Sequence, residues 1–239
     1  MTNYKKWFTS LVAGLALLIA GCVTPPTTMP STGDIPPLIS QWAEKHVWKI
    51  KGEDGGHGSG FWINTREMVT ACHVVNKLRN NKGVAIPNDK SIVVTFKVTS
   101  CNKDTDVAIL ERTSLDDSIW FDPTPISYVL PSKNSRVYGA GYPLWFPLTI
   151  NDGWFGEEII FPTGEIRYTN SVPTIMGDSG SPLLSIRSGK VFVEGVRVSL
   201  ATVPDRFSRD YITHMAMATS GRQILTELIS NNARKQGKK

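Results

Sequence analysis

Residues 177–182 (GDSGSP) place Ser179 between two glycines. Glycine adopts backbone angles that other residues reach only under strain, so this turn can present the serine hydroxyl and neighbouring backbone N–H groups on one side. That arrangement suits a nucleophile beside an oxyanion hole. Because a serine hydroxyl is a weak nucleophile at its own pKa, the chemistry also requires a histidine base and a carboxylate that orients it. The chain has a candidate for each, in His73 and Asp106.

His73 and Asp106 each lie at a boundary between expected elements. Residues 68–75 (MVTACHVV) put His73 where a short apolar strand gives way to a helical turn. Asp106 precedes the apolar run 107–110 (VAIL), which is typical of a buried strand. Each motif alone has a structural explanation: a hydrogen-bonded interior histidine, a strand-end cap, or a turn with two glycines. Their combination with the glycine-containing segment 58–63 (GSGFWI) favours a Ser-His-Asp triad.

With these motifs in the order His, Asp, Ser, the chain resembles the chymotrypsin-like (trypsin-like) serine peptidase family, in particular its bacterial branch. Residues 58–63 look like that branch's Gly-Ser-Gly-Phe strand, and the resemblance covers about residues 40–230. It implies an all-β fold of two six-stranded antiparallel β-barrels followed by a C-terminal α-helix. The active site would lie between the barrels, with His73 and Asp106 on the first and Ser179 on the second.

The resemblance also implies a mechanism and a class of substrate. Ser179 would attack a peptide carbonyl, His73 would carry the proton to the leaving amine, and Asp106 would hold the imidazole. The backbone N–H groups of Gly177 and Ser179 would bind the oxyanion. We therefore expect a serine endopeptidase that acts on proteins or peptides and uses no metal and no cofactor.

The expected specificity pocket has no acidic residue at its floor. The family's floor position, six residues before Ser179, is Pro173, so selection of Arg or Lys is not expected. Val198, Ser199 and Leu200 would form the pocket wall, with Leu200 where a glycine would leave the pocket open. These four residues predict a shallow apolar pocket for small aliphatic side chains.

Asp178 raises a question about activation. In the secreted digestive members of the family, this aspartate pairs with a new N-terminal amine that cleavage releases. Two alternatives remain open for this chain. Another group or water could satisfy Asp178, giving a constitutively active enzyme, or cleavage near residues 38–46 could supply the amine. Ser181, which replaces a common glycine of the family, is small enough to fit.

Two other functions compete with the endopeptidase. A membrane-tethered binding protein could use the protease fold without turnover, although such a protein would not need an intact triad. An esterase could use the same acyl transfer, but its Gly-x-Ser-x-Gly elbow is absent because Ser181 stands two residues after Ser179.

The N-terminus predicts export and lipid attachment. Two lysines precede the apolar stretch 11–21, which is short for a membrane span and is followed at once by Cys22. Residues 18–22 (LIAGC) resemble a bacterial lipobox, so residues 1–21 would be a signal peptide and Cys22 would carry the lipid that binds the membrane. In a Gram-negative host, Val23 implies the outer membrane, facing the periplasm. The alternatives are an ordinary secretory signal and an uncleaved anchor.

The mature chain has room for one domain of two lobes. We expect a Pro/Thr-rich tether over 22–38, an N-terminal barrel over 39–125, a C-terminal barrel and helix over 126–233, and a basic tail over 234–239. Runs rich in β-branched and aromatic residues predict strands at 46–50, 59–63, 92–98, 107–111, 159–161, 182–186, 190–198 and 211–217. Thr219 or Ser220 would cap the terminal helix.

Charge and cysteine content add two further points. The net charge is +5, and +3 without residues 1–21, with no basic groove pattern with interleaved aromatics to indicate a nucleic-acid partner. If Cys22 is lipidated, Cys72 and Cys101 remain as a pair that could form a disulfide in an oxidising compartment. Two separate buried thiols are the alternative. A zinc site with His57 fits no structural zinc spacing.

Overall fold

The computed structural model describes residues 34–52, 56–113, 119–162, 164–202 and 212–237. The predicted signal peptide, Cys22 and most of the predicted tether lie outside these residues. Among the helices of the described part, none has the length and apolar character needed to cross a membrane.

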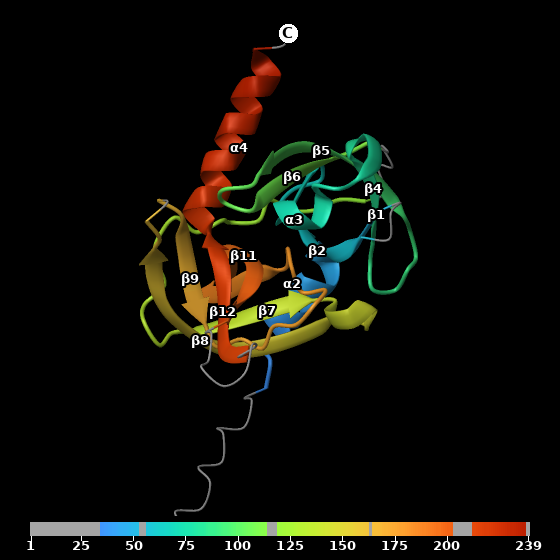
Figure 1. Ribbon diagram of the computed structural model, residues 1–239. Coiled ribbons are helices and arrows are strands. Elements are labelled where there is room, and N and C mark those ends of the chain that lie inside the picture. The colour runs from blue at the N-terminus through green and yellow to red at the C-terminus, as the bar shows by residue number, and fades with distance from the viewer. Residues whose placement is uncertain (1–33, 53–55, 114–118, 163, 203–211, 238–239) are drawn as a thin grey trace, which may run out of the picture. The chain divides into compact units, whose positions relative to one another are not determined.

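The first barrel is closed and antiparallel, with strand order β1-β2-β3-β6-β5-β4 (Figure 1). A one-turn helix, α3 (Cys72–Val75), and a 3₁₀ turn, η1 (Arg79–Asn81), connect β3 to β4. The strands are β1 (Val47–Gly52), β2 (His57–Trp62), β3 (Glu67–Ala71), β4 (Lys82–Ile86), β5 (Val94–Asn102) and β6 (Val107–Arg112).

The second barrel is also closed and antiparallel, with order β10-β11-β12-β9-β8-β7. Its strands are β7 (Arg136–Gly141), β8 (Thr149–Ile160), β9 (Ile166–Asn170), β10 (Pro182–Arg187), β11 (Lys190–Thr202) and β12 (Ile212–Ser220), with a 3₁₀ turn, η2 (Pro143–Trp145), after β7. The predicted fold of two six-stranded antiparallel barrels with a C-terminal helix is therefore confirmed. The sequence patterns did not indicate β4, β7 or β9.

Aromatic side chains fill the interior at one end of the first barrel. Trp62 is fully buried and stacks on Phe121, with ring centroids 5.1 Å apart. Trp48 meets Trp62 edge to face at 5.6 Å. Such pairs bury large apolar areas, and their geometry favours one packing arrangement over others. The β2 strand therefore has a fixed position from which it reaches the second barrel.

Helix α2 (Pro37–His46) precedes the first barrel and was not expected. Pro37 stands in the first turn, where its missing N–H costs nothing. Ile39 and Ala43, four residues apart on one helix face, are fully buried against β1 and β11. Residues 37 and 38, which the sequence predicts to be part of the tether, thus belong to a packed helix.

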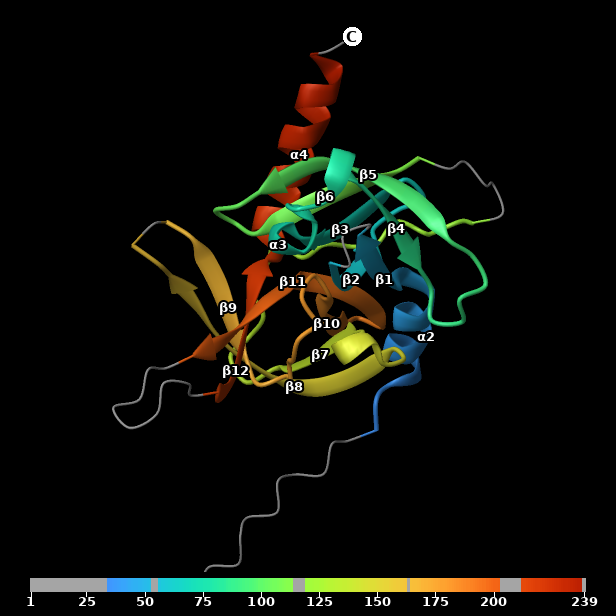
Figure 2. The same ribbon diagram turned by 45° about the vertical axis from the view of Figure 1, so that its right-hand side comes forward.

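Helix α4 (Gly221–Gln236) packs on strands of both barrels, namely β5, β6, β11 and β12 (Figure 2). Ser220 caps it, since its hydroxyl accepts a hydrogen bond from the Gln223 N–H at 3.4 Å. The helix continues through residues 234–236, which were predicted to lie in a basic tail. Arg234 pairs with Glu227 at 2.7 Å and Lys235 with Glu67 at 3.3 Å, so these cations are held in ion pairs.

Ser59 of β2 joins the two barrels. Its backbone N–H donates to the Ser179 carbonyl at 2.9 Å, and its hydroxyl donates to the Gly177 carbonyl at 2.8 Å. The same hydroxyl accepts from the Tyr142 backbone N–H, also at 2.9 Å. Ser59 is fully buried, so these bonds are shielded from water. One side chain of the first barrel therefore positions two loops of the second.

We predict that Ser59→Ala lowers the free energy of unfolding by about 1–3 kcal/mol, because buried backbone groups of Gly177 and Tyr142 lose their partner. Equilibrium urea unfolding measures the change. Ser91→Ala is the control, since Ser91 is exposed and its hydroxyl donates a hydrogen bond to the Asp89 carboxylate. That variant should stay within about 0.5 kcal/mol of the parent. Equal effects of the two substitutions would contradict the role of Ser59.

Candidate active site

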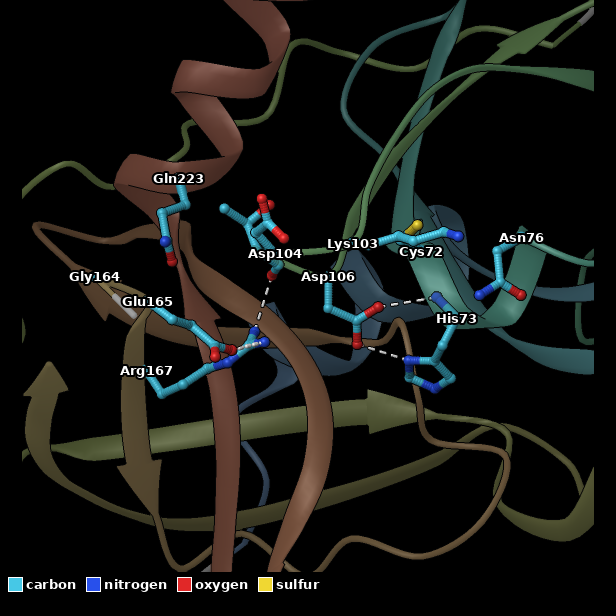
Figure 3. Close-up of a pocket in the computed structure, with 11 residues that line it drawn as sticks. Cys72, His73, Asn76, Lys103, Asp104, Asp106, Gly164, Glu165, Arg167 and Gln223 are labelled. Carbon is cyan, nitrogen blue, oxygen red and sulfur yellow. Dashed lines mark hydrogen bonds and ion pairs between the residues drawn. The ribbon is translucent and has the colours of Figure 1, made fainter. Parts of the chain in front are cut away.

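His73 and Asp106 form a direct pair (Figure 3). His73 Nδ1 lies 2.6 Å from Asp106 Oδ2. The other carboxylate oxygen, Oδ1, accepts a hydrogen bond from the His73 backbone N–H at 2.9 Å. The carboxylate thus fixes both the ring and the backbone of the histidine. When Nδ1 donates its proton to Asp106, Nε2 of the neutral ring is left as a proton acceptor.

The register of the first barrel explains why these two residues meet. Ala71 at the end of β3 pairs with Val107 at the start of β6, so the residues that follow Ala71 and precede Val107 lie side by side. The Cys72 N–H donates to the Asp106 carbonyl at 3.0 Å. Asp106 has a φ of 55°, in the left-handed region that aspartate tolerates better than most residues.

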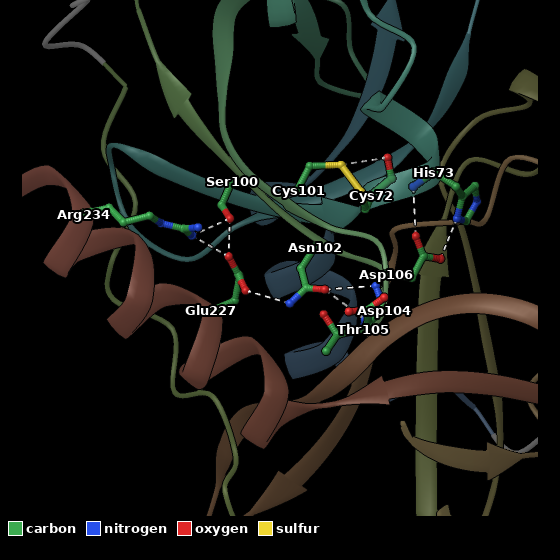
Figure 4. The surroundings of a disulfide bond; sticks show 10 residues. All are labelled: Cys72, His73, Ser100, Cys101, Asn102, Asp104, Thr105, Asp106, Glu227 and Arg234. Carbon is green, nitrogen blue, oxygen red and sulfur yellow. Dashed lines mark hydrogen bonds and ion pairs between the residues drawn. A yellow bond between two sulfur atoms is a disulfide. The ribbon is translucent and has the colours of Figure 1, made fainter. Parts of the chain in front are cut away.

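A disulfide joins Cys72 to Cys101 directly beside the histidine (Figure 4). It links α3 to β5, and Cys101 lies opposite Ala108 of β6 in the sheet. The cysteines are 29 residues apart, for which loop closure predicts a contribution of about 3.6 kcal/mol to stability. The part of the chain that the structure describes holds no cluster of side chains that could bind a metal ion.

The turn around Ser179 leaves two N–H groups free. Gly177 and Gly180 have φ values of +98° and +86°, as expected for glycines that shape a tight turn. The N–H groups of Asp178, Gly180 and Ser181 donate to backbone carbonyls. Within the described residues, neither Gly177 nor Ser179 donates its N–H to another group. Two unpaired backbone donors beside a serine are what an oxyanion hole requires.

The structure brings the serine turn against the strand that carries the histidine. A side chain on Gly180 would collide with the first barrel, since its Cβ would lie 2.2 Å from the Ser59 carbonyl oxygen and 2.9 Å from the Ala71 nitrogen. Ala71 is two residues before His73. No hydrogen bond joins Ser179 Oγ to His73 among the described residues. Hydrogen bonds between catalytic groups are often long in the absence of substrate and shorten when substrate binds. The lack of this bond is therefore compatible with Ser179 and His73 acting together.

Asp178 has a partner inside the chain. Its side chain is 3% exposed, and Oδ2 lies 3.6 Å from Nη2 of Arg197, whose side chain is 1% exposed. The Ile175 N–H also donates to Oδ2, at 3.1 Å. Burial raises the pKa of Asp178, whereas Arg197 and the Ile175 N–H act in the opposite direction. No motif of the sequence predicts a role for Arg197; the signal it does carry is a single arginine between Val196 and Val198 in the predicted strand 190–198.

Arg197 also occupies the region predicted for the specificity pocket. Its Nη2 donates to the Pro173 carbonyl and to Thr174 Oγ1. Pro173 is exposed and Val198 is buried, while the side chains of Ser199 and Leu200 lie outside the described residues. The guanidinium therefore bonds to the predicted pocket floor.

A cavity of about 920 Å³ opens beside the His73–Asp106 pair (Figure 3). Its far side is formed by Glu165, Arg167 and Gln223 of the second barrel and α4. Arg167 crosses between the barrels and donates to the Thr105 carbonyl at 2.9 Å. The cavity lies on the Asp106 side of the pair, and no residue of the turn 177–182 lines it.

Comparisons with known proteins agree with this geometry. Residues 58–192 match the family model of the trypsin-like peptidase domain. The chain is 27% identical over 150 residues to the putative protease Do-like 3, mitochondrial, of Arabidopsis thaliana, covering 57% of this chain and 25% of that protein. It is 29% identical over 106 residues to the putative protease Do-like 12 of the same plant, covering 44% and 21%. The chain thus spans a quarter or less of these relatives.

Solved structures show the same fold. The Rv3671c protease of M. tuberculosis in its inactive form has a TM-score of 0.64 and 24% identity, over 81% of this chain and 92% of that chain. A serine endoprotease from Yersinia pestis has a TM-score of 0.62 and 14% identity, over 83% and 68%. At these identities the likeness concerns the fold alone. Because the family model matches more than half of the chain, the protein belongs to the trypsin-like peptidase family, as its motifs predicted.

Proposed function

We propose that this protein is a serine endopeptidase in which Ser179, His73 and Asp106 form the catalytic triad. The observation that carries the proposal is the 2.6 Å contact between His73 Nδ1 and Asp106 Oδ2. This contact selects the imidazole tautomer whose Nε2 can accept a proton. Family membership and the free N–H groups at the serine turn support the same chemistry.

In the proposed mechanism, Ser179 Oγ attacks the peptide carbonyl while His73 Nε2 takes the hydroxyl proton. Asp106 stabilises the imidazolium that forms. The N–H groups of Gly177 and Ser179 bind the oxyanion, and each such donor contributes about 100- to 1,000-fold to the rate in comparable enzymes. His73 then protonates the leaving amine, and water hydrolyses the acyl-enzyme by the reverse sequence of proton transfers.

A non-catalytic binding protein is the second candidate. The observation that favours it is the lack of a hydrogen bond between Ser179 Oγ and His73 in the described structure. The two free N–H groups and the oriented imidazole favour turnover instead. An esterase would use the same residues, so a comparison of peptide and simple ester substrates separates it from a peptidase.

We predict that a fluorophosphonate probe labels the whole chain at Ser179, and that Ser179→Ala and His73→Ala abolish labelling. The probe reacts only with an activated serine, so the measurement tests the nucleophile and the base together. Mass spectrometry of the labelled peptide identifies the site. His57→Ala is the matched control, because His57 packs on Trp145 with ring centroids 4.4 Å apart and has no part in the proposed triad. Labelling that survives Ser179→Ala would remove Ser179 from the mechanism.

We propose a preference for small aliphatic residues immediately before the scissile bond. The hydrogen bonds from Arg197 to Pro173 and Thr174 support this proposal, since the guanidinium takes up space at the predicted pocket floor. A peptide library should then yield cleavage mainly after residues such as Ala and Val. Cleavage dominated by Arg, Lys or Phe would contradict it, because those side chains need a deep open pocket.

We also propose that Cys22 is lipidated and anchors the enzyme in the cell envelope, on the periplasmic face of the outer membrane in a Gram-negative host. The lipobox-like residues 18–22 support this placement. In a bacterial host, Cys22→Ser should stop incorporation of labelled palmitate and move the protein out of the membrane fraction, whereas Thr24→Ala should change neither. Palmitate incorporation into Cys22→Ser would disprove this attachment site.

A further inference from the structure

The carboxylate of Asp178 lies in the interior directly before Ser179. An unpaired buried carboxylate is strongly destabilising, so its position depends on a counter-charge. Arg197 supplies that charge at 3.6 Å, and both side chains are almost completely buried. The Ile175 N–H adds a hydrogen bond to the same oxygen. The pair is therefore shielded from water and salt.

Arg197 contacts the chain on both sides of the serine. Before Ser179, its Nη2 donates to the Pro173 carbonyl and Thr174 Oγ1. After Ser179, its Nη1 donates to Ser181 Oγ at 3.3 Å. Its backbone carbonyl accepts from the Gly180 N–H, and its N–H donates to the Ser181 carbonyl, both at 2.8 Å. The β11 strand thus holds the whole turn through one residue.

The space around the ion pair is closed. A Cβ on Gly139 would lie 2.5 Å from Arg197 Nη1, and a Cβ on Gly141 would lie 2.6 Å from Asp178 Oδ1. The backbone of β7 is therefore in close contact with both Asp178 and Arg197. An additional ammonium group next to Asp178 would have to displace the guanidinium.

The segment that would have to be cut to release a new amine is part of the packed structure. Residues 38–46 lie in α2, where Ile39 and Ala43 are fully buried. His46 Nδ1 is 3.0 Å from the Trp62 carbonyl oxygen, and the Val47 carbonyl accepts a hydrogen bond from Tyr142 Oη at 3.0 Å. A protease could reach this segment only after α2 left the core.

We infer that Arg197 is a positioning residue that replaces the cleavage-generated amine, pairing with Asp178 so that the Ser179 turn is formed without processing of the N-terminus. This inference rests on the proposed function and assigns its regulation: the enzyme is active as the uncut chain. Arg197 acts through Asp178, which keeps the N–H groups of Gly177 and Ser179 directed at the oxyanion. Both the ion pair and the buried helix α2 support it.

The test compares fluorophosphonate labelling rates and the intact mass of the labelled protein, using the whole chain in detergent. The labelled parent should retain all of residues 38–46. The probe should label Arg197→Met at least about 100-fold more slowly than the parent, which is the effect of losing one oxyanion donor. Arg197→Lys, which keeps the charge, should recover part of that loss. Arg187→Met is the matched control, since Arg187 pairs with buried Glu194 at 2.6 Å in the same barrel and should label at the parental rate.

Two results would overturn the inference: label found only in chains cut within 38–46, or parental labelling of Arg197→Met. If Arg197→Met does not fold, Asp178→Asn combined with Arg197→Met removes both charges and takes its place. That variant should fold, and it should label more slowly than the parent, because no ion pair holds the Ser179 turn; labelling of this variant at the parental rate would overturn the inference. The mass of the labelled parent decides the question of cleavage without any variant. Complete lack of labelling in the parent would remove the proposed function itself, which the other outcomes leave intact.

Discussion

The ion pair between Asp178 and Arg197 is the constraint on which the geometry of the site depends. A buried pair contributes little net stability compared with apolar side chains of similar volume, but loss of one partner leaves an uncompensated charge. Such a pair therefore specifies an arrangement more than it stabilises the fold. Here it fixes the loop before Ser179 to the interior of the second barrel, and the two glycines on either side of Asp178–Ser179 give the loop its tight turn.

The second constraint is the packing of one barrel on the other. His73 and Asp106 are brought together within the first barrel by the pairing of β3 with β6. Ser179 reaches them only through contacts between barrels, chiefly those of Ser59 with Gly177 and Ser179. Helix α4 lies across strands of both barrels and stabilises the same arrangement from outside. The distance between Ser179 and His73, the proposed nucleophile and base, is thus a property of the whole fold.

The sequence predicted those features that follow from local patterns. Runs of β-branched residues indicated strands such as β6, and motifs indicated the His73–Asp106 pair. Helix α2 was missed because its buried residues follow a proline-rich stretch and give too short a helical period to recognise; they are Ile39, Ala43 and His46. Strand β7 contains two glycines that weaken its strand pattern. The partner of Asp178 depends on a contact between distant strands, which no local pattern encodes.

Arg197 takes part both in neutralising Asp178 and in shaping the proposed specificity pocket. The same guanidinium that neutralises Asp178 also donates to Pro173 and Thr174, at the floor of the proposed specificity pocket. A substitution that enlarges the pocket by shortening this side chain removes the counter-charge as well. At residue 197, the shape of the proposed specificity pocket and the formation of the proposed oxyanion turn therefore cannot vary independently. A wider specificity would first require another cation beside Asp178 to hold the turn.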